Sequence, residues 1–308
     1  MSALEDRLSD YLTLRRSLGF KLERPGQLLA QFVAWMEEAD ESTITVDLAV
    51  AWAMQPVGAD PIWWGARLHA VRIFAGYLQS IDPGTEIPPA DLLPARSRRA
   101  EPFDYTDADI AGLLAAARSI HSPLRAATYE TLIGLLAATG MRVGEALRLD
   151  RCDIDLTVGL LQVLGSKFGK SREVPLHPSV TTALANYTRV RARWCPRPVD
   201  PSFFVSTTGT RVIYQNVHTT FRHLVRMAGI EARSRRCRPR IHDLRHRFAV
   251  STLLAWHSNG IEIGPMLPVL STYLGHACPS STYWYLHATP ELFGLVAERL
   301  ESAMEGQS

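Results

Sequence analysis

Four prolines close together divide this chain into two parts. Pro83, Pro88, Pro89 and Pro94 lie within one short stretch, and proline breaks a helix because it lacks a backbone N–H and its ring clashes with the preceding turn. Residues 83–102 are therefore predicted to form a linker between residues 1–82 and residues 103–308. A total of 308 residues is sufficient for two domains of ordinary size.

The N-terminal part is predicted to be a small bundle of helices. Apolar residues recur with the spacing of an amphipathic helix in four segments, residues 4–19, 26–38, 46–54 and 62–79. Helices of this length joined by short loops pack as a bundle. Trp63 and Trp64 fall in the fourth segment, where we expect them to pack in the core.

The C-terminal part is predicted to be mainly helical with one small β-sheet. Residues 158–164 and 171–176 flank a glycine-containing loop, a pattern typical of a hairpin. The expected fold class is therefore α+β, mainly α with a small β-sheet. Helical spacing predicts a turn and a short helix within residues 140–149, and helices at about 107–119, 122–139, 179–193, 213–228, 242–256, 265–274 and 290–303.

The apolar runs and the cysteines favour a soluble protein of the cytoplasm. No apolar run reaches the length of a membrane span, and charged residues among the first ten argue against a signal peptide. The four cysteines form no Cys-x-x-Cys pair, so neither a zinc ribbon nor a dithiol redox site is indicated. Reduced thiols in a cytoplasmic protein are expected instead.

Positive charge is concentrated in one block of the sequence. The net charge of the whole chain is only +2, yet residues 189–247 contain 14 arginines and no lysine against Asp200, Glu231 and Asp243. Such a block is typical of a surface that binds a polyanion such as DNA. From charge alone, a solvated surface without a partner explains the block equally well.

Side chains with the chemistry of a phosphate site occur at five places in the C-terminal part. Each has a structural explanation when taken alone: Arg142 could pair with Glu145 on the surface, His276 could cap a helix, and Tyr285 could be a half-buried core residue. No single motif therefore establishes a function. The candidates are Arg142, Lys167, Lys170, His242, Arg245, His276 and Tyr285.

Taken together, these motifs resemble the tyrosine recombinase (phage integrase) family. The resemblance rests on residues 138–145 (ATGMRVGE), 242–249 (HDLRHRFA), 274–276 (LGH) and 285–287 (YLH), in the order that the family has. It covers residues 103–308 as a catalytic domain, and residues 1–82 resemble the family's helical domain that clamps core DNA. It implies an enzyme that cleaves and rejoins DNA at specific sites through a 3′-phosphotyrosyl intermediate, with strand exchange through a Holliday junction.

The resemblance implies which residues hold the phosphate. Arg142 and Arg245 match the two arginines of the family, and guanidinium groups suit this role because they stay charged and bind phosphate oxygens with two donors. His276 matches a position that hydrogen-bonds the same phosphate. Glu145 and Asp243 are expected to orient the arginines rather than to react.

The resemblance also implies a nucleophile and a general acid. Tyr285 matches the tyrosine that attacks phosphorus, and His242 matches a residue that assists it. Lys167, in the hairpin loop, matches the lysine that protonates the leaving 5′-oxygen. The rival candidates are Lys170 for the lysine and Tyr273 or Tyr283 for the tyrosine.

Cofactors and partners are expected from the same resemblance. Arginine, lysine and histidine supply the positive charge, so no metal ion, ATP or other cofactor is expected. The expected partner is double-stranded DNA, bound by a homotetramer on two DNA sites, with no membrane and with a place in the nucleoid. Leu292, Leu295, Val296 and Leu300 share one face of the last predicted helix, which would dock on a neighbouring subunit or pack within its own chain.

Two alternative functions remain open from the sequence. A nicking-closing enzyme of the type IB topoisomerase kind would use the same residues and relax DNA without exchanging partners. A DNA-binding regulator would keep the scaffold without catalysis, although the complete set of arginines, lysine, histidines and tyrosine argues against it. Integration and transposition of a mobile element are the activities that the main interpretation favours.

Overall fold

The structure, a computed structural model, describes residues 3–94, 101–165, 171–276, 282–283 and 285. It divides into two compact units, Met1–Ala100 and Glu101–Ser308, and each unit has its own apolar core. The boundary lies inside the segment whose prolines predicted a linker. Within the described ranges, no helix is long and apolar enough to cross a lipid bilayer.

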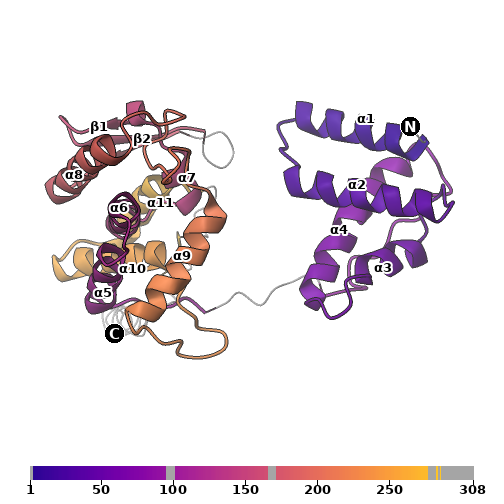
Figure 1. The fold of residues 1–308 in the computed structure, drawn as a ribbon. Coiled ribbons are helices and arrows are strands. Elements are labelled where there is room, and N and C mark those ends of the chain that lie inside the picture. Colours follow the sequence, from indigo (N-terminus) through magenta and orange to yellow (C-terminus); the bar gives the residue numbers. More distant parts are fainter. Residues whose placement is uncertain (1–2, 95–100, 166–170, 277–281, 284, 286–308) are drawn as a thin grey trace, which may run out of the picture. The chain divides into compact units, whose positions relative to one another are not determined.

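Helices make up the N-terminal unit (Figure 1). Thr45 and Asp60 begin two of them by accepting hydrogen bonds from the backbone N–H groups of Leu48 (3.2 Å) and Ile62 (2.9 Å), as N-cap residues do. The ends differ from the predicted segments by at most three residues. The helices are α1 (Ala3–Ser17), α2 (Glu23–Glu38), α3 (Val46–Met54) and α4 (Pro61–Leu78).

The core of the N-terminal unit is built around aromatic rings. Phe32, Trp52 and Phe74 are fully buried, and the Arg67 guanidinium lies 3.7 Å from the centre of the Trp52 ring while donating to the Trp52 carbonyl (2.8 Å). Cation–π contact and hydrogen bond together compensate for burying this charge.

Trp63 and Trp64 only partly meet the expectation that they are core residues. Both are half-buried, because they lie in the first turn of α4, at the margin of the bundle. Trp63 packs against the core on one side and meets the Arg24 guanidinium on the other, 4.6 Å from its ring centre. The Trp64 ring N–H donates to the Pro56 carbonyl (3.0 Å).

The C-terminal unit is mainly helical, as predicted. The predicted helix start near residue 107 is confirmed: Thr106 and Asp109 form a reciprocal capping box, with bonds of 3.1 and 2.8 Å. The predicted helix at 290–303 lies outside the described residues. The helices are α5 (Asp107–Arg118), α6 (Pro123–Thr139), α7 (Val143–Arg148), α8 (Pro178–Trp194), α9 (Tyr214–Met227), α10 (Asp243–Ser258) and α11 (Ile263–Leu274).

A small antiparallel sheet accompanies these helices. The predicted hairpin is present as β2 (Leu160–Val163) and β3 (Arg172–Pro175), with Leu161 opposite Val174. A third strand, β1 (Ile154–Asp155), follows a short 3₁₀ turn (η1, Arg151–Asp153) and pairs with β2. The sequence did not predict β1, because two residues are too few to show an alternating pattern.

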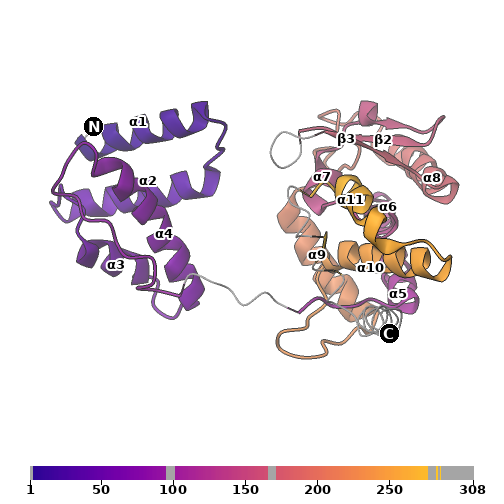
Figure 2. The ribbon, with the colours of Figure 1, turned by 180° about the vertical axis from the view of Figure 1, so that it is seen from behind.

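Helix α6 lies at the centre of the C-terminal unit. It packs against α5, α8 and α10 (Figures 1 and 2), and its buried face includes Leu132, Ile133 and Leu136. A smaller apolar cluster joins α10 to α11 and includes Leu253, Leu270 and Tyr285. The start of α10, the end of α11 and the end of α6 thereby come together, although they are far apart in the sequence.

Candidate active site

The turn between α6 and α7 places Arg142. Helix α6 ends at Gly140, whose φ of 60° is a left-handed conformation that favours glycine. A Cβ at this position would lie 2.4 Å from the ring of Phe248, so a side chain there would also clash. Arg142 is then the N-cap residue of α7, and its backbone N–H donates to Glu145 (3.0 Å).

The start of α10 places Arg245 and His242. Arg245 lies in the first turn, is only 2% exposed, and donates to the carbonyls of Gly140 (2.9 Å) and Leu274 (2.8 Å). Burial lowers its pKa to about 10, a shift that a hydrogen bond and charge interaction with Tyr285 partly offset. Arg245 therefore stays charged at neutral pH. His242, the N-cap residue of α10, is exposed.

Three arginine side chains bind backbone carbonyls at the C-terminus of α11. Its last carbonyls lack helical partners. A Schellman turn at Gly275 satisfies those of Ser271 and Thr272, through the N–H groups of His276 and Gly275. The next three carbonyls, of residues 273–275, each accept from a different guanidinium, at 2.7–2.8 Å. The donors are Arg172 to Tyr273, Arg245 to Leu274 and Arg142 to Gly275.

A single buried carboxylate pairs with two of these arginines. Glu145 is 3% exposed and accepts from Arg142 Nη1 (2.7 Å) and Arg172 Nη2 (2.8 Å). Burial alone would raise its pKa, but the hydrogen bonds and charges of Arg172 and Arg142 dominate and hold the pKa at about 2. The carboxylate is therefore ionised at neutral pH, and it fixes both guanidinium groups.

His276 follows the end of α11 directly. Its Nδ1 is hydrogen-bonded to Thr282 Oγ1 (2.7 Å). Desolvation and the charges of Arg245, Arg142 and Arg172 lower its pKa to about 4. The ring is therefore neutral at pH 7, and an incoming anion would meet a positively charged surrounding with a hydrogen-bonding imidazole in it.

Tyr285 lies against this cluster. This residue is 6% exposed, its ring centre is 5.9 Å from that of His276 and 5.3 Å from that of His246, and it interacts electrostatically with Arg245. The Tyr285 ring therefore lies beside the two histidine rings at the start of α10 and the end of α11.

The rival tyrosines are placed differently. Tyr283 is 49% exposed. The Tyr273 ring stacks on Phe248 with ring centres 5.6 Å apart, and only its backbone carbonyl takes part in the arginine contacts. Geometry therefore favours Tyr285, the tyrosine preferred from the sequence.

Five of the predicted site residues thus lie around the start of α10 and the end of α11: Arg142, His242, Arg245, His276 and Tyr285. His242 is the residue just before α10, and desolvation and the charges of Arg245 and Arg142 lower its pKa. Lys167 and its rival Lys170 lie outside the described residues.

Two features of the site were not predicted. Arg172 contributes a third guanidinium, and His246 contributes a ring against Tyr285; the position of His246 directly after Arg245 was the only signal for it. The expectation for Asp243 was wrong in its partner: this buried carboxylate pairs with Arg240 (2.8 Å), not with Arg142 or Arg245, because its side chain leaves the helix toward the preceding loop.

Comparisons with known proteins establish the family of this chain. The sequence profile of the Phage integrase family matches residues 105–291. An integrase/recombinase of Sinorhizobium fredii, y4rB, is 41% identical over the full length of both chains. This chain belongs to the phage integrase family of tyrosine recombinases. Its enzymatic activity is accordingly the cleavage and rejoining of DNA strands at specific sites, and its fold class is the one predicted.

More distant relatives extend the same family. A tyrosine recombinase XerC of Azotobacter vinelandii is 30% identical over 71% of this chain and 67% of its own length. In fold, the chain is similar to the integrase of the transposon Tn1549 in complex with a circular intermediate DNA, with a TM-score of 0.65 at 17% identity over 96% of this chain and 99% of the other. It is also similar to a lambda integrase dimer bound to a core site, with a TM-score of 0.63 at 16% identity over 93% and 96%.

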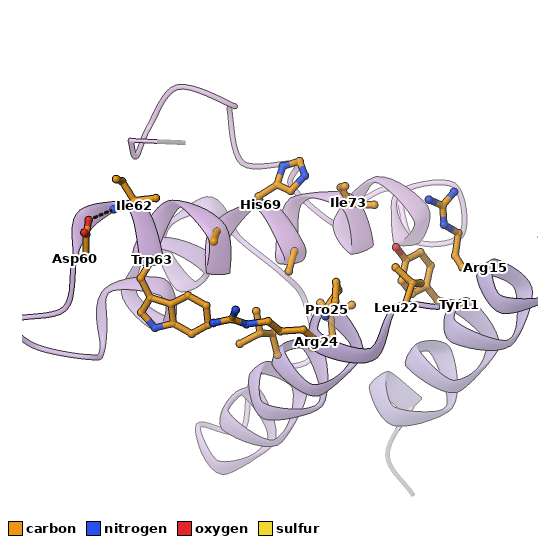
Figure 3. Close-up of a pocket in the computed structure, with 14 residues that line it drawn as sticks. Tyr11, Arg15, Leu22, Arg24, Pro25, Asp60, Ile62, Trp63, His69 and Ile73 are labelled. Carbon is orange, nitrogen blue, oxygen red and sulfur yellow. Dashed lines mark hydrogen bonds between the residues drawn. The ribbon is translucent and has the colours of Figure 1, made fainter. Parts of the chain in front are cut away.

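A hollow occurs in the N-terminal unit of this recombinase (Figure 3). It measures about 480 Å³ and is lined mainly by apolar side chains of α1, α2 and α4, among them Leu28, Trp63 and Ile73. Its polar lining residues are Tyr11, Arg15, Arg24, Asp60 and His69. The described residues also contain no cluster of three His, Cys, Asp or Glu side chains that could bind a metal ion.

The depressed pKa of His276 predicts a pH dependence of stability. Because the folded pKa is about 4 and the usual value is 6.5, the unfolded chain binds a proton between these values that the folded protein does not. The contribution of His276 to the free energy of unfolding is therefore fully present above about pH 6.5. It is lost as the pH falls toward 4. Thermal unfolding midpoints at pH 7.5 and 5 should show this loss, and His276→Gln should reduce it.

His223, which is exposed on α9, provides the control for that titration. His223→Gln should leave the difference between the two pH values as in the original protein. An unchanged pH dependence in His276→Gln would show that other groups cause it. Protonation of Glu145, whose pKa is about 2 against a usual 4.5, should add a further loss below pH 4.5.

Proposed function

We propose that Tyr285 cleaves one DNA strand at a phosphate held by Arg142, Arg245 and His276. The single observation that carries this assignment is their convergence: two guanidinium groups are fixed on carbonyls at the end of α11, His276 follows directly, and the Tyr285 ring centre lies 5.9 Å from that of His276. A phosphodiester in cleavage builds charge on its non-bridging oxygens, which fixed cations stabilise.

The proposed step forms one bond and breaks one. The Tyr285 oxygen attacks phosphorus, its proton passes to a neighbouring base, and the bond from phosphorus to the 5′-oxygen breaks. Lys167 supplies the proton that the 5′-oxygen needs to leave, and His242 assists the tyrosine. The 3′-phosphotyrosyl bond keeps the phosphodiester energy, so a 5′-hydroxyl can reverse the step without ATP.

Enough donors remain on the two arginines for this role. A guanidinium has five N–H donors. Among the described residues, Arg142 uses one for Glu145 and one for Gly275, and Arg245 uses two for carbonyls besides its contact with Tyr285. The protein contacts therefore orient the guanidinium groups without exhausting them.

The proposal extends to the assembly. Exchange of strands between two DNA sites needs four cleavages, so we infer a homotetramer on two double-stranded sites that resolves a Holliday junction, at work on the DNA of the nucleoid. The integrase of a transposon among the similar folds supports integration and transposition as the setting.

A suicide substrate tests the proposed function. The DNA flanking the gene supplies the recombination site, and a nick placed next to the scissile phosphate lets the cleaved fragment diffuse away. The protein should then form a covalent complex that survives denaturation, with or without EDTA. Complete loss of the complex in EDTA would contradict the mechanism. Relaxation of supercoiled DNA without exchange of partners would identify a nicking-closing enzyme instead.

An arginine-rich loop is the part of the predicted basic block that we expect to touch the DNA backbone. Arg235, Arg236 and Arg238 are exposed, while the loop is anchored by Cys237, whose thiol donates to the Pro102 carbonyl (3.5 Å). Arg240 helps to hold the loop in place, because its guanidinium binds Asp243 and the Glu101 carbonyl. We therefore do not expect it to contact DNA.

Replacing the three exposed arginines of this loop by alanine should weaken DNA binding and flatten its salt dependence. Each lost phosphate contact lowers the slope of log K against log salt by about 0.9. Fluorescence anisotropy at several salt concentrations measures both. Arg118→Ala, which removes an exposed arginine paired with Glu130, is the control. An equal salt slope in the two variants would show that the loop does not contact DNA phosphates.

A further inference from the structure

Arg172, the first residue of β3, joins two parts of the active site. Its guanidinium donates to both carboxylate oxygens of Glu145, at 2.8 and 3.3 Å, and its Nε donates to the Tyr273 carbonyl at the end of α11 (2.7 Å). The side chain is only 10% exposed. A guanidinium with a two-pronged contact on one side and a carbonyl on the other is held in one orientation.

These contacts close a ring directly next to His276 in the chain. From the Tyr273 carbonyl the ring passes through Arg172 to Glu145, and from Glu145 to Arg142 Nη1 (2.7 Å). Arg142 Nη2 completes it at the Gly275 carbonyl (2.8 Å), one residue before His276. The position of Arg142 relative to His276 therefore depends on Arg172 as well as on the hydrogen bond from Arg142 to the Gly275 carbonyl.

The turn before His276 also packs on Arg172. A Cβ built on Gly275 would lie 2.8 Å from Arg172 Nη1 and 3.1 Å from its Cζ. Only glycine allows the backbone to come so close, and the φ of 67° at this residue is equally suited to glycine. The guanidinium thus forms the surface on which the end of α11 rests.

Arg172 also decides how much positive charge faces a phosphate. Arg142 and Glu145 alone form a neutral pair, and a buried carboxylate bound only to Arg142 would offset the charge needed by the substrate. With Arg172 the three groups carry a net charge of +1, and Arg172 binds both carboxylate oxygens. Arg142 keeps one side-chain bond to Glu145, and its remaining donors are available for phosphate.

We propose that Arg172 is a positioning residue for strand cleavage: it ties Glu145 to the end of α11, so that Arg142 and His276 are presented to the same phosphate. The inference rests on the proposed function of this site. Arg172 acts through its neighbours and need not touch DNA. Its place five residues after Lys167 in the chain means that the same contact anchors the strand that follows the lysine loop.

The first variant that tests this inference is Arg172→Lys. Lysine keeps the charge, but a single ammonium cannot hold both oxygens of Glu145 and the Tyr273 carbonyl together. Single-turnover cleavage of a suicide substrate should fall roughly 10- to 100-fold, the loss typical of groups that orient a binding side chain. DNA affinity should change much less, and thermal unfolding measures how far the fold is kept.

Arg211→Lys is the matched control. Arg211 also binds a carboxylate and a carbonyl, with Nη2 at 2.6 Å from Asp150 and Nη1 at 2.8 Å from the Leu147 carbonyl. It lies at the other end of α7 and, within the described part of the chain, forms no hydrogen bond or ion pair with the residues of the site. Its replacement should leave the cleavage rate close to that of the original protein, and thermal unfolding measures its cost to the fold.

A second substrate separates positioning from general damage. A methylphosphonate at the scissile position lacks one charged oxygen, so it gains less from a well-placed Arg142 than a normal phosphate does. The loss caused by Arg172→Lys should therefore be clearly smaller on the methylphosphonate. A variant that is merely less well folded loses the same factor on both substrates, because only its active fraction changes.

The outcomes distinguish this inference from the proposed function. If the original protein forms no covalent complex with the normal substrate, the proposed function fails and this inference fails with it. If the original protein reacts but Arg172→Lys reacts equally fast, or loses the same factor on both substrates, the positioning role alone is wrong. A loss confined to the charged substrate supports it.

Discussion

Replacing Tyr285 with phenylalanine should abolish the covalent protein–DNA complex. The substitution removes only the hydroxyl oxygen, which is the atom expected to bond to phosphorus. Loss of a nucleophile leaves no alternative route to the same intermediate, so the yield of covalent complex should fall by at least about a thousandfold. The suicide substrate and a denaturing gel measure it directly.

The fold should tolerate this change. The Tyr285 ring packs against His276 and His246, and a phenylalanine ring keeps both contacts. DNA affinity should therefore stay near its original value, which shows that the variant is folded and loses only its chemistry.

Tyr283→Phe and Tyr273→Phe are the controls for the nucleophile. Tyr283 is exposed and Tyr273 stacks on Phe248, so both variants should still form the complex. A complex that persists in Tyr285→Phe and disappears in Tyr283→Phe would move the nucleophile to the neighbouring tyrosine.

Arg245→Ala should have the second-largest effect, on both catalysis and stability. Removal of one fixed donor to a developing oxyanion commonly costs about a hundred- to a thousandfold in rate, and Arg245 also contacts Tyr285. The substitution further leaves the buried carbonyls of Gly140 and Leu274 without this donor. Each unsatisfied buried group costs about 1–3 kcal/mol of unfolding free energy.

Cleavage rate and denaturant unfolding measure these two losses separately. Arg247→Ala is the control on the same helix, since Arg247 forms an ion pair with the exposed Asp107 (3.0 Å) and exposed pairs contribute less than about 1 kcal/mol. Arg245→Lys keeps a cation with fewer donors and should fold better than Arg245→Ala while remaining slow in cleavage. An Arg245→Lys variant that cleaves at the original rate would contradict the role given to this guanidinium.

The helices could be predicted from the sequence because each buries one apolar face, and that requirement leaves a periodic pattern. The match is close for α3, where prediction and structure agree on Val46–Met54. It fails for β1, since a strand of two residues has no period. The hairpin of β2 and β3 was predicted from two segments that flank a glycine-containing loop, and its register was not.

Within the site, chemistry could be predicted and contacts could not. Arg142, Arg245, His276 and Tyr285 were recognisable because their motifs stand in a characteristic order. Arg172 escaped notice because an arginine in a short strand resembles any surface arginine. Asp243 was assigned to the wrong arginines because the sequence does not show which way a side chain leaves the first turn of a helix.

The amino-acid sequence by itself determined the family of this protein, the helical periodicity of both parts and the residue types able to bind and cleave a phosphate. Only the tertiary structure decided which guanidinium meets which carbonyl, since Arg142 and Gly275 are separated by 133 positions and Arg172 and Tyr273 by 101. The physical reason is that local periodicity follows from burying a face of one element. The partners of a side chain depend on how several elements pack together, and the residues next to it in the sequence do not show that packing.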